Sequence, residues 1–200
     1  MEMTNTAALL TLLILSGTLR VAALECDRIR DASPGGLVLY LGKTVPDQEN
    51  AECVVFAINR LGEQRYERAI PILAKLLDFP WPPNARQKQK LFVIEHDGGS
   101  IYPAATALQK IGKKSLPSVL EVMKSRSASR TAQEVAISVW MGIYKSEVPK
   151  GVALLKQESD RTKDPATRQR LGWAAYKAIG WCGLSDKAQC QAAVNTRYSN

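Results

Sequence analysis

The sequence contains an internal repeat, and this repeat limits the possible folds more than any other feature. Residues 104–124 align on residues 136–156 without a gap, at an offset of 32 positions. Apolar residues recur at matching positions in the two copies, and Pro117 of the first corresponds to Pro149 of the second. Self-similarity with a period of roughly 20 to 50 residues is typical of one supersecondary unit that is stacked several times along a chain.

Weaker copies precede and follow this pair. Ahead of it, Gly62 corresponds to Gly112 and is followed by Pro71, with a hairpin turn that is four residues longer. After it, Gly180 takes the same place, and the pattern then decays. The third copy carries Tyr144 where the glycine is expected, and the fourth lacks the second-helix proline. The chain therefore contains about four units, with altered turns in the last two.

Each unit is predicted to be two helices joined by a tight turn. In the copy at 104–124, apolar residues at steps of three and four mark one face of the first helix: Ala104, Ala107, Leu108 and Ile111. Gly112 ends this helix, because glycine adopts the left-handed conformation without steric cost. The second helix begins near Ser115, with Pro117 in its first turn, where a missing amide costs nothing. Neither helix pair can hide its apolar face alone, so successive pairs must stack.

This pattern of an alanine-rich first helix ending in Ile-Gly or Leu-Gly, then a second helix with proline near its start, resembles HEAT-like repeats. It is most similar to the short repeats named after phycobilisome lyases, over residues 50–193. The resemblance implies an all-α fold: a short right-handed α-solenoid of about four stacked helical hairpins. These motifs indicate a fold and say little about activity.

The same patterns give the expected domain organisation: a signal peptide at 1–23, an N-terminal cap segment at 24–49 and a HEAT-like repeat domain at 50–200. Residues 79–83 are expected to be an extended connector, because three prolines in four residues exclude a helix interior. A further helix at 86–95 and a loop at 97–100 follow it. The remaining helices are expected at 36–41, 50–61, 65–77, 102–111, 116–124, 129–144, 148–158, 165–179 and 185–194.

The first segment resembles a secretory leader. Residues 7–15 are almost continuously apolar, which is shorter than the roughly 20 residues that a membrane span needs, and small residues precede a cleavage point after Ala23. Residues 1–3 depart from the usual pattern of a positively charged start, because they contain Glu2 and neither Lys nor Arg. A retained anchor or a buried first helix is the alternative to a cleaved leader. We expect a periplasmic or secreted protein with no membrane span after the leader is removed.

Cysteine usage agrees with export. All four cysteines follow Ala23, and an even number suits disulfides in an oxidising compartment. Four cysteines allow three pairings, of which the layout near each end favours Cys26 with Cys53 and Cys182 with Cys190. Four buried thiols in a cytosolic protein are the alternative. A zinc site is disfavoured, because the sequence has no C-x-x-C pair and one histidine.

The sequence gives little support for catalysis. His96 lies between Glu95 and Asp97, an arrangement that allows acid–base chemistry but is also ordinary for a solvated loop. Deoxyhypusine hydroxylases are HEAT-like enzymes that bind metal through several His-Glu steps, whereas here the order is Glu-His and occurs once. Phosphate-binding loops and nucleophile elbows are absent from the sequence. We expect a non-enzyme without cofactor or metal, with a His96-dependent enzyme as the weakest alternative.

Because the sequence gives little support for catalysis, we expect this chain to be a non-catalytic scaffold that binds a protein or peptide. Aromatic residues of the last two repeats are predicted to pack between repeats, whereas Trp81, flanked by prolines, is a candidate for exposure. Basic residues support a second hypothesis, binding of an anionic envelope polymer or surface, since the net charge is +8. Alkylpurine glycosylases bind DNA on basic HEAT-like surfaces. An exported protein rarely meets its own genome, so we rank nucleic acid below protein as a partner. The densest basic group is Lys110, Lys113, Lys114, Lys124, Arg126 and Arg130.

Overall fold

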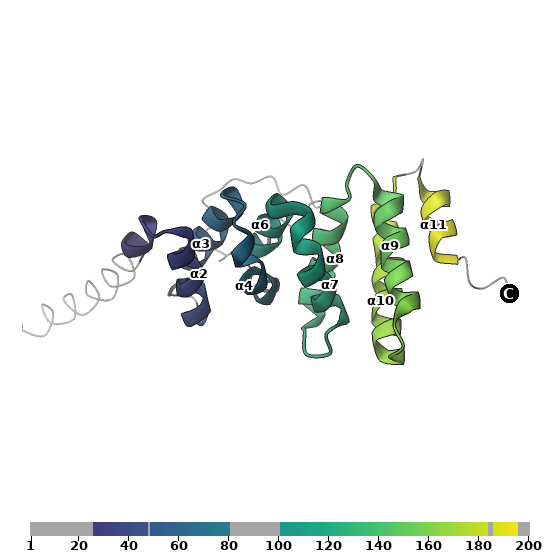
Figure 1. Cartoon of the computed structure of the whole chain (residues 1–200), viewed down its shortest axis with the longest axis horizontal. Coiled ribbons are helices and arrows are strands. Elements are labelled where there is room, and N and C mark those ends of the chain that lie inside the picture. Colours follow the sequence, from purple (N-terminus) through teal and green to yellow (C-terminus); the bar gives the residue numbers. More distant parts are fainter. Residues whose placement is uncertain (1–25, 48, 81–100, 184–185, 196–200) are drawn as a thin grey trace, which may run out of the picture.

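The computed structural model describes residues 26–47, 49–80, 101–183 and 186–195, and within these ranges every regular element is helical. The predicted all-α class is therefore confirmed for the described part of the chain (Figure 1). Its α-helices are α2 (Pro34–Lys43), α3 (Ala51–Glu63), α4 (Ile70–Lys75), α6 (Pro103–Ile111), α7 (Leu116–Lys124), α8 (Arg130–Ile143), α9 (Val148–Arg161), α10 (Pro165–Ala178) and α11 (Lys187–Asn195). Single 3₁₀ turns lie between them at η1 (Glu67–Ala69), η2 (Gly112–Ser115) and η3 (Ile179–Trp181).

The helices begin where the sequence supplies caps and prolines. Three caps accept a hydrogen bond from the amide three residues ahead: Ser33 before α2 at 3.2 Å, Ser129 before α8 at 3.0 Å and Asp164 before α10 at 2.9 Å. Because Ser33 caps α2, this helix starts two residues before the expected position. Proline occupies the first turn of six helices, where its lost amide costs nothing.

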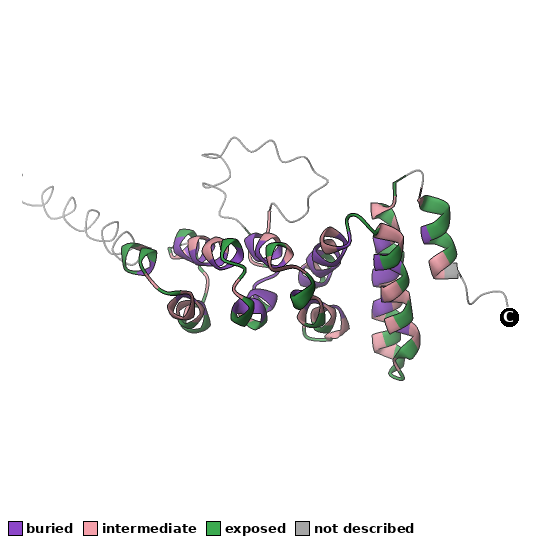
Figure 2. Ribbon diagram, turned by 45° about the horizontal axis from the view of Figure 1, so that its top comes forward, coloured by how far each residue is buried: buried purple, intermediate pink, exposed green. Residues whose placement is uncertain are grey.

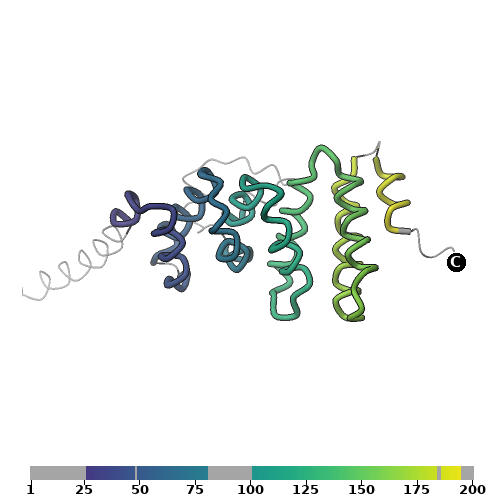
Figure 3. The backbone as a smooth tube through the Cα atoms, in the orientation of Figure 1, coloured from purple at the N-terminus to yellow at the C-terminus, as the bar shows by residue number. Residues whose placement is uncertain are grey.

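The helices stand side by side in a row along the long axis of the molecule (Figures 1 and 3). The first helices of successive hairpins contact one another, α3 with α6, α6 with α8 and α8 with α10. The second helices form another layer, in which α4 packs on α7 and α11 packs on α9. Each second helix also packs on the next first helix, as α7 does on α8 and α9 on α10.

A single cluster of buried apolar side chains joins these helices from Ile29 to Cys190. Buried residues lie on the inward faces of both layers, and exposed residues lie on the outer faces (Figure 2). Among the described glycines, Gly62 lies closest to the backbone of another helix: a Cβ added there would lie 2.6 Å from the Cα of Ala107 in α6. Helix-to-helix burial of this kind removes apolar surface from water and stabilises the row.

The turns differ between repeats as the sequence indicates. Gly112 ends α6 with a positive φ of 84°, a conformation that favours glycine. At the equivalent place in the next repeat, Tyr144 follows α8 with φ of −95°, so that turn closes without a positive φ. The buried Tyr144 ring instead fills the space over Gly151, where an added Cβ would lie 2.9 Å from the Cβ of Tyr144. In this repeat the turn therefore needs no glycine, and the glycine that permits close packing, Gly151, lies in α9 instead.

Two disulfides connect residues near the ends of the described fold. Cys26 is bonded to Cys53 and Cys182 to Cys190, with Cα–Cα distances of 5.1 and 6.6 Å, and no cysteine is left free. This is the pairing that the layout along the sequence favours. Both distances lie in the range usual for disulfides, about 4.4 to 6.8 Å.

Several predicted features lie outside the described residues. They are the leader at 1–23, the candidates Trp81 and His96, most of the connector at 79–83, and the helix and loop expected at 86–100. Within the described ranges, no helix combines the length and the apolarity needed to cross a membrane.

Candidate functional site

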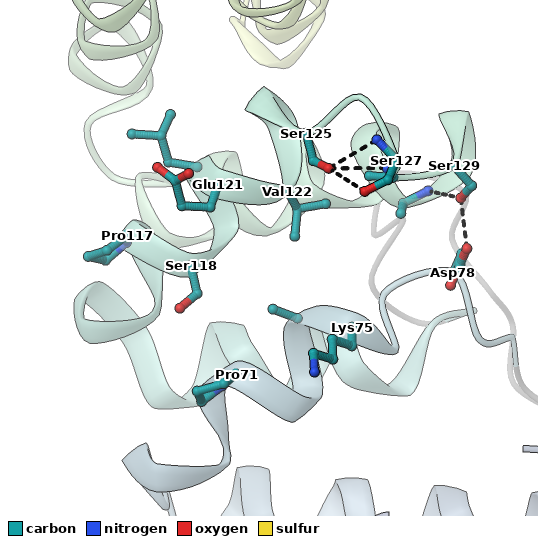
Figure 4. A pocket seen from close by; sticks show the side chains of 14 residues that line it. Pro71, Lys75, Asp78, Pro117, Ser118, Glu121, Val122, Ser125, Ser127 and Ser129 are labelled. Atoms are coloured by element: carbon teal, nitrogen blue, oxygen red, sulfur yellow. Dashed lines mark hydrogen bonds between the residues drawn. The ribbon is translucent and has the colours of Figure 1, made fainter. Parts of the chain in front are cut away.

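A groove of about 650 Å³ lies between α4 and α7 and extends to the start of α8 (Figure 4). It belongs to the layer of second helices, so its two walls are equivalent helices of adjacent repeats. The lining residues are Pro71, Ala74, Lys75, Asp78, Pro117, Ser118, Leu120, Glu121, Val122, Ser125, Ser127, Ala128, Ser129 and Ala132.

The apolar part of the groove combines small or rigid side chains with Leu120 and Val122 of α7. Pro71 and Pro117 are exposed in the first turns of the two wall helices. Ala74, Ala128 and Ala132 are too short to fill the space between the walls, which leaves a hollow instead of packed core. Grooves of this kind, mostly apolar with a few polar groups at the rim, are where proteins commonly bind ligands.

The serines at the α8 end of the groove are held in a hydrogen-bond network. The hydroxyl of Ser129 donates to Asp78 at 2.7 Å and also caps α8. The hydroxyl of Ser125 lies 3.0 Å from that of Ser127 and accepts from the amides of Ser127 and Ala128. These bonds fix the α7–α8 loop against the end of α4 (Figure 4).

The charged residues at the groove differ in their partners. Glu121 lies 3.3 Å from the ammonium of Lys124, which also pairs with Glu158 at 3.6 Å. Lys75 is exposed on α4, and the described residues offer it no ion pair within 4.0 Å. Asp78, at the end of α4, likewise has no ion pair within 4.0 Å among the described residues, so the groove presents charges of both signs.

The basic group predicted as a partner-binding site is largely engaged in ion pairs. Five of its members lie within 4.0 Å of a carboxylate, mostly on a neighbouring hairpin: Lys110 with Glu63, Lys114 with Glu67, Lys124 with Glu158, Arg126 with Asp164 and Arg130 with Glu134. All of these pairs except Arg130–Glu134, which lies within α8, join residues far apart in sequence and so connect repeats. The structure therefore does not gather these residues into one free basic surface.

Lys113, the sixth member, lies near a further carboxylate. A hydrogen bond from Lys150 and its charge hold the pKa of Glu147 below its ordinary value, and the charge of Lys113 lowers it further. Lys113 is exposed and makes no ion pair with a described residue within 4.0 Å. It is the member of the group best placed to contact an external anion.

The aromatic residues of the last repeats mostly pack, as predicted, with one exception. Trp140 is 5% exposed, donates its indole N–H to the carbonyl of Gly151 at 3.0 Å and lies 5.5 Å from the ring of Tyr144. The guanidinium of Arg130 lies 3.4 Å above the ring of Trp173, a cation–π contact between α8 and α10. The prediction was wrong for Tyr176, which is 67% exposed.

The described ranges contain no group of three or more His, Cys, Asp or Glu side chains arranged to hold a metal. His96 and Trp81 are not among these residues, so the geometry around them is not part of the site.

The groove itself was not predicted from the sequence. Pro71 and Pro117 were interpreted only as helix starts, and Ser125, Ser127 and Ser129 received no role. The available signal was the recurrence of a proline at equivalent positions, which places both prolines on one layer of the stack. The hollow between them depends on the small residue Ala74, whose significance appears only when α4 and α7 are adjacent.

Comparison with known proteins adds no relative: no protein-family model, curated protein or solved structure matches this chain.

Proposed function

We propose that this chain is an exported, non-catalytic scaffold that binds a protein or peptide in the α4–α7 groove. In this proposal it is a short right-handed α-solenoid of HEAT-like hairpins, and its leader at 1–23 is removed. The layered row of helices and the recurring prolines support the solenoid. The two disulfides support an oxidising compartment, periplasmic or extracellular.

The groove is the single observation that best supports a binding function. Its apolar lining comes from two adjacent repeats, and its serine rim is already hydrogen-bonded within the protein. A partner that covers the groove gains apolar burial and need not break the Ser129–Asp78 bond. Repeat proteins commonly bind partners on the extended surfaces that their stacked repeats form.

The alternative, an anionic envelope polymer as the ligand, rests on the distribution of charge. Residues 101–183 contain fourteen Lys and Arg against six Asp and Glu, whereas residues 26–80 contain seven against eight. The pairing of Lys110, Lys114 and Arg126 with carboxylates weakens this alternative. Binding of a polymer predicts an affinity that falls steeply with salt, which binding in an apolar groove does not.

The test fills the groove and measures partner capture. Ala128→Trp places a large ring in the hollow, and Gln169→Trp adds the same ring to an exposed position of α10 outside the groove. We expect the wild type and Gln169→Trp to retain the same partner from the native exported fraction, and Ala128→Trp to lose it. Equal retention by all three proteins, at matched thermal stability, would show that binding does not use the groove.

A further inference from the structure

The helix α2, at the N-terminal end of the row (Figure 1), carries an apolar outer face that the described residues leave uncovered. Its inward side chains, Leu37 and Leu41, are buried in the core, whereas Leu39 on the opposite side is 63% exposed. Val45, just beyond the helix, is 81% exposed, and a Cβ added at Gly42 would meet nothing within 4 Å. Exposed apolar residues that gather on one face are typical of a site of contact with another molecule.

The two ends of the row are capped differently. Terminal units of stacked repeats normally carry a polar outer face, which keeps the stack soluble. The helix α11, at the other end of the row, follows this rule, because its exposed residues include Lys187, Gln189 and Gln191. In α2, by contrast, Lys43 at the last position is the only charged residue. The N-terminal end of the row therefore has a face suited to further helix packing.

We propose that α2 packs against α2 of a second copy of this chain, as an antiparallel pair related by a two-fold axis. The ends of the chain supply no other occupant for this face. With the leader removed, a step that rests on the proposed function, only residues 24 and 25 precede Cys26, too few to cover a helix of 10 residues. Residues after Asn195 follow α11, which lies at the opposite end of the row.

Charge favours the antiparallel arrangement. Lys43 ends α2, Asp31 lies just ahead of its first turn, and both are exposed. A two-fold axis perpendicular to the helices sets the C-terminal end of each α2 beside the N-terminal end of the other, so Lys43 of each copy approaches Asp31 of the other. A parallel pair would instead set Lys43 against Lys43.

A head-to-tail stack fits these observations less well. In such a stack, α2 of one copy meets the C-terminal end of the next copy, and the contact repeats into a ring or a filament. The large apolar residue exposed towards that end of the chain is Tyr176 of α10, whose other exposed residues include Arg168, Gln169 and Lys177. A two-fold pair joins two like faces, each of which supplies apolar surface.

One pair of helices makes a small interface, so the dimer should dissociate on dilution. While it is formed, the dimer carries two α4–α7 grooves. A partner with two binding segments would then gain affinity from simultaneous contact with both grooves.

The test measures the mass of the assembly in solution. The chain is expressed with its leader and purified from the exported fraction, and its intact mass reports where it starts. Sedimentation velocity over a dilution series gives the dimer Kd for the wild type, Leu39→Glu and Tyr176→Glu. Tyr176→Glu is the matched control, because it makes a large exposed apolar residue acidic at the other end of the row. Circular dichroism checks that each variant is folded.

We expect a monomer–dimer equilibrium for the wild type. Leu39→Glu should raise the dimer Kd by about tenfold or more, because both copies lose an apolar contact, whereas Tyr176→Glu should change it by less than about twofold. Lys43→Glu should raise Kd by about fivefold, because Glu then faces Asp31 of the other copy. The charge swap that combines Asp31→Lys with Lys43→Glu should restore Kd to within about twofold, a rescue that a merely structural role would not give.

Each other outcome contradicts a named part of the inference. A processed chain that stays monomeric at every concentration would overturn the dimer, and weakening by Tyr176→Glu equal to that by Leu39→Glu would replace it with a head-to-tail stack. A charge swap that fails to rescue would overturn the antiparallel order. A different protein that co-purifies with the wild type and is lost from Leu39→Glu would replace the second copy as the occupant.

The proposed function fails by different results. A monomeric chain that still starts at Met1 would assign the α2 face to an uncleaved leader and would remove processing from the proposed function. Binding in the groove is tested separately by Ala128→Trp, which lies outside α2. Loss of the dimer with partner capture intact would therefore overturn this inference alone.

Discussion

Each end of the described row of helices carries one disulfide, but the two bonds connect very different amounts of packing. Cys53 is buried in α3, and its bond to Cys26 encloses α2, which packs on both α3 and α4. Cys190 is the only buried residue among those described in α11, and its bond to Cys182 encloses a short turn. The N-terminal bond is therefore attached to the core, whereas the C-terminal bond holds a helix that has little core of its own.

A disulfide contributes differently to a well-buried element, such as α3, and to a weakly buried one, such as α11. A bond between elements that already pack adds mainly to global stability, because it restricts the unfolded chain. A bond to a weakly buried helix decides whether that helix stays in place at all. The C-terminal link thus protects the face of α9, which α11 covers.

The largest effect is expected at the N-terminal bond. Replacing both Cys26 and Cys53 by Ala opens a link with a sequence separation of 27 residues, which should lower the free energy of unfolding by about 3.5 kcal/mol. Urea unfolding followed by circular dichroism should show one cooperative transition at lower midpoint. Unchanged stability would mean that this bond adds nothing to the packing of α2 on α3.

The C-terminal bond should give a smaller and more local effect. Its sequence separation is 8 residues, which corresponds to about 2.5 kcal/mol. With Cys182 and Cys190 both replaced by Ala, we expect amides of α11 to exchange with deuterium much faster while those of α3 and α6 keep their protection. Faster exchange throughout the chain would contradict the distinction between the two ends.

Between the ends, the close junction of α3 and α6 tests packing without a covalent link. The Cβ introduced by Gly62→Ala would lie 2.6 Å from the backbone of Ala107, so α3 and α6 must separate, at a cost of about 2 kcal/mol. Gly42→Ala is the matched control, because nothing lies within 4 Å of its new Cβ. This control should stabilise α2 slightly, by about 0.5 kcal/mol, and both changes are measurable by urea unfolding.

The smallest expected effect is a loss of folding stability at low pH. A side-chain hydrogen bond from Thr167, then the bond from its amide, lower the pKa of Asp164 in the folded protein. Because the folded pKa lies below the unfolded one, the stabilisation is complete above the unfolded pKa and is lost as the pH falls through the folded pKa. Asp164→Asn keeps a capping oxygen but does not titrate, so the stability advantage of the wild type over this variant should shrink below about pH 4.

The control for the effect of acid is Asp31→Asn, which removes the same charge from an exposed residue that caps no helix N-terminus. The difference between this variant and the wild type should depend less on pH. Urea midpoints measured at several pH values would test this, and an advantage of Asp164 that persists in strong acid would exclude the carboxylate as its source.

The all-α class and several helix starts could be predicted from local signals in the sequence, whereas the groove depends on contacts between residues far apart in the chain. Ser129, Asp164 and Pro117 mark helix starts through contacts within a few residues, so their roles are legible in one dimension. Lys114 looked like part of a basic patch because its partner, Glu67, is 47 residues earlier. The groove was missed for the same reason, since the space beside Ala74 exists only when the next repeat is in position.

The ion pairs between turns also depend on the order of the repeats. Along one edge, acids Glu63 and Glu67 meet lysines Lys110 and Lys114 of the following hairpin, and Lys113 acts in turn on Glu147 of the next. Acids near the first turn therefore face lysines near the second, whereas the third turn carries charges of both signs. An array lengthened by duplicating the hairpin of α6 and α7 would set lysines against lysines, so growth of this chain by simple tandem copying carries an electrostatic penalty.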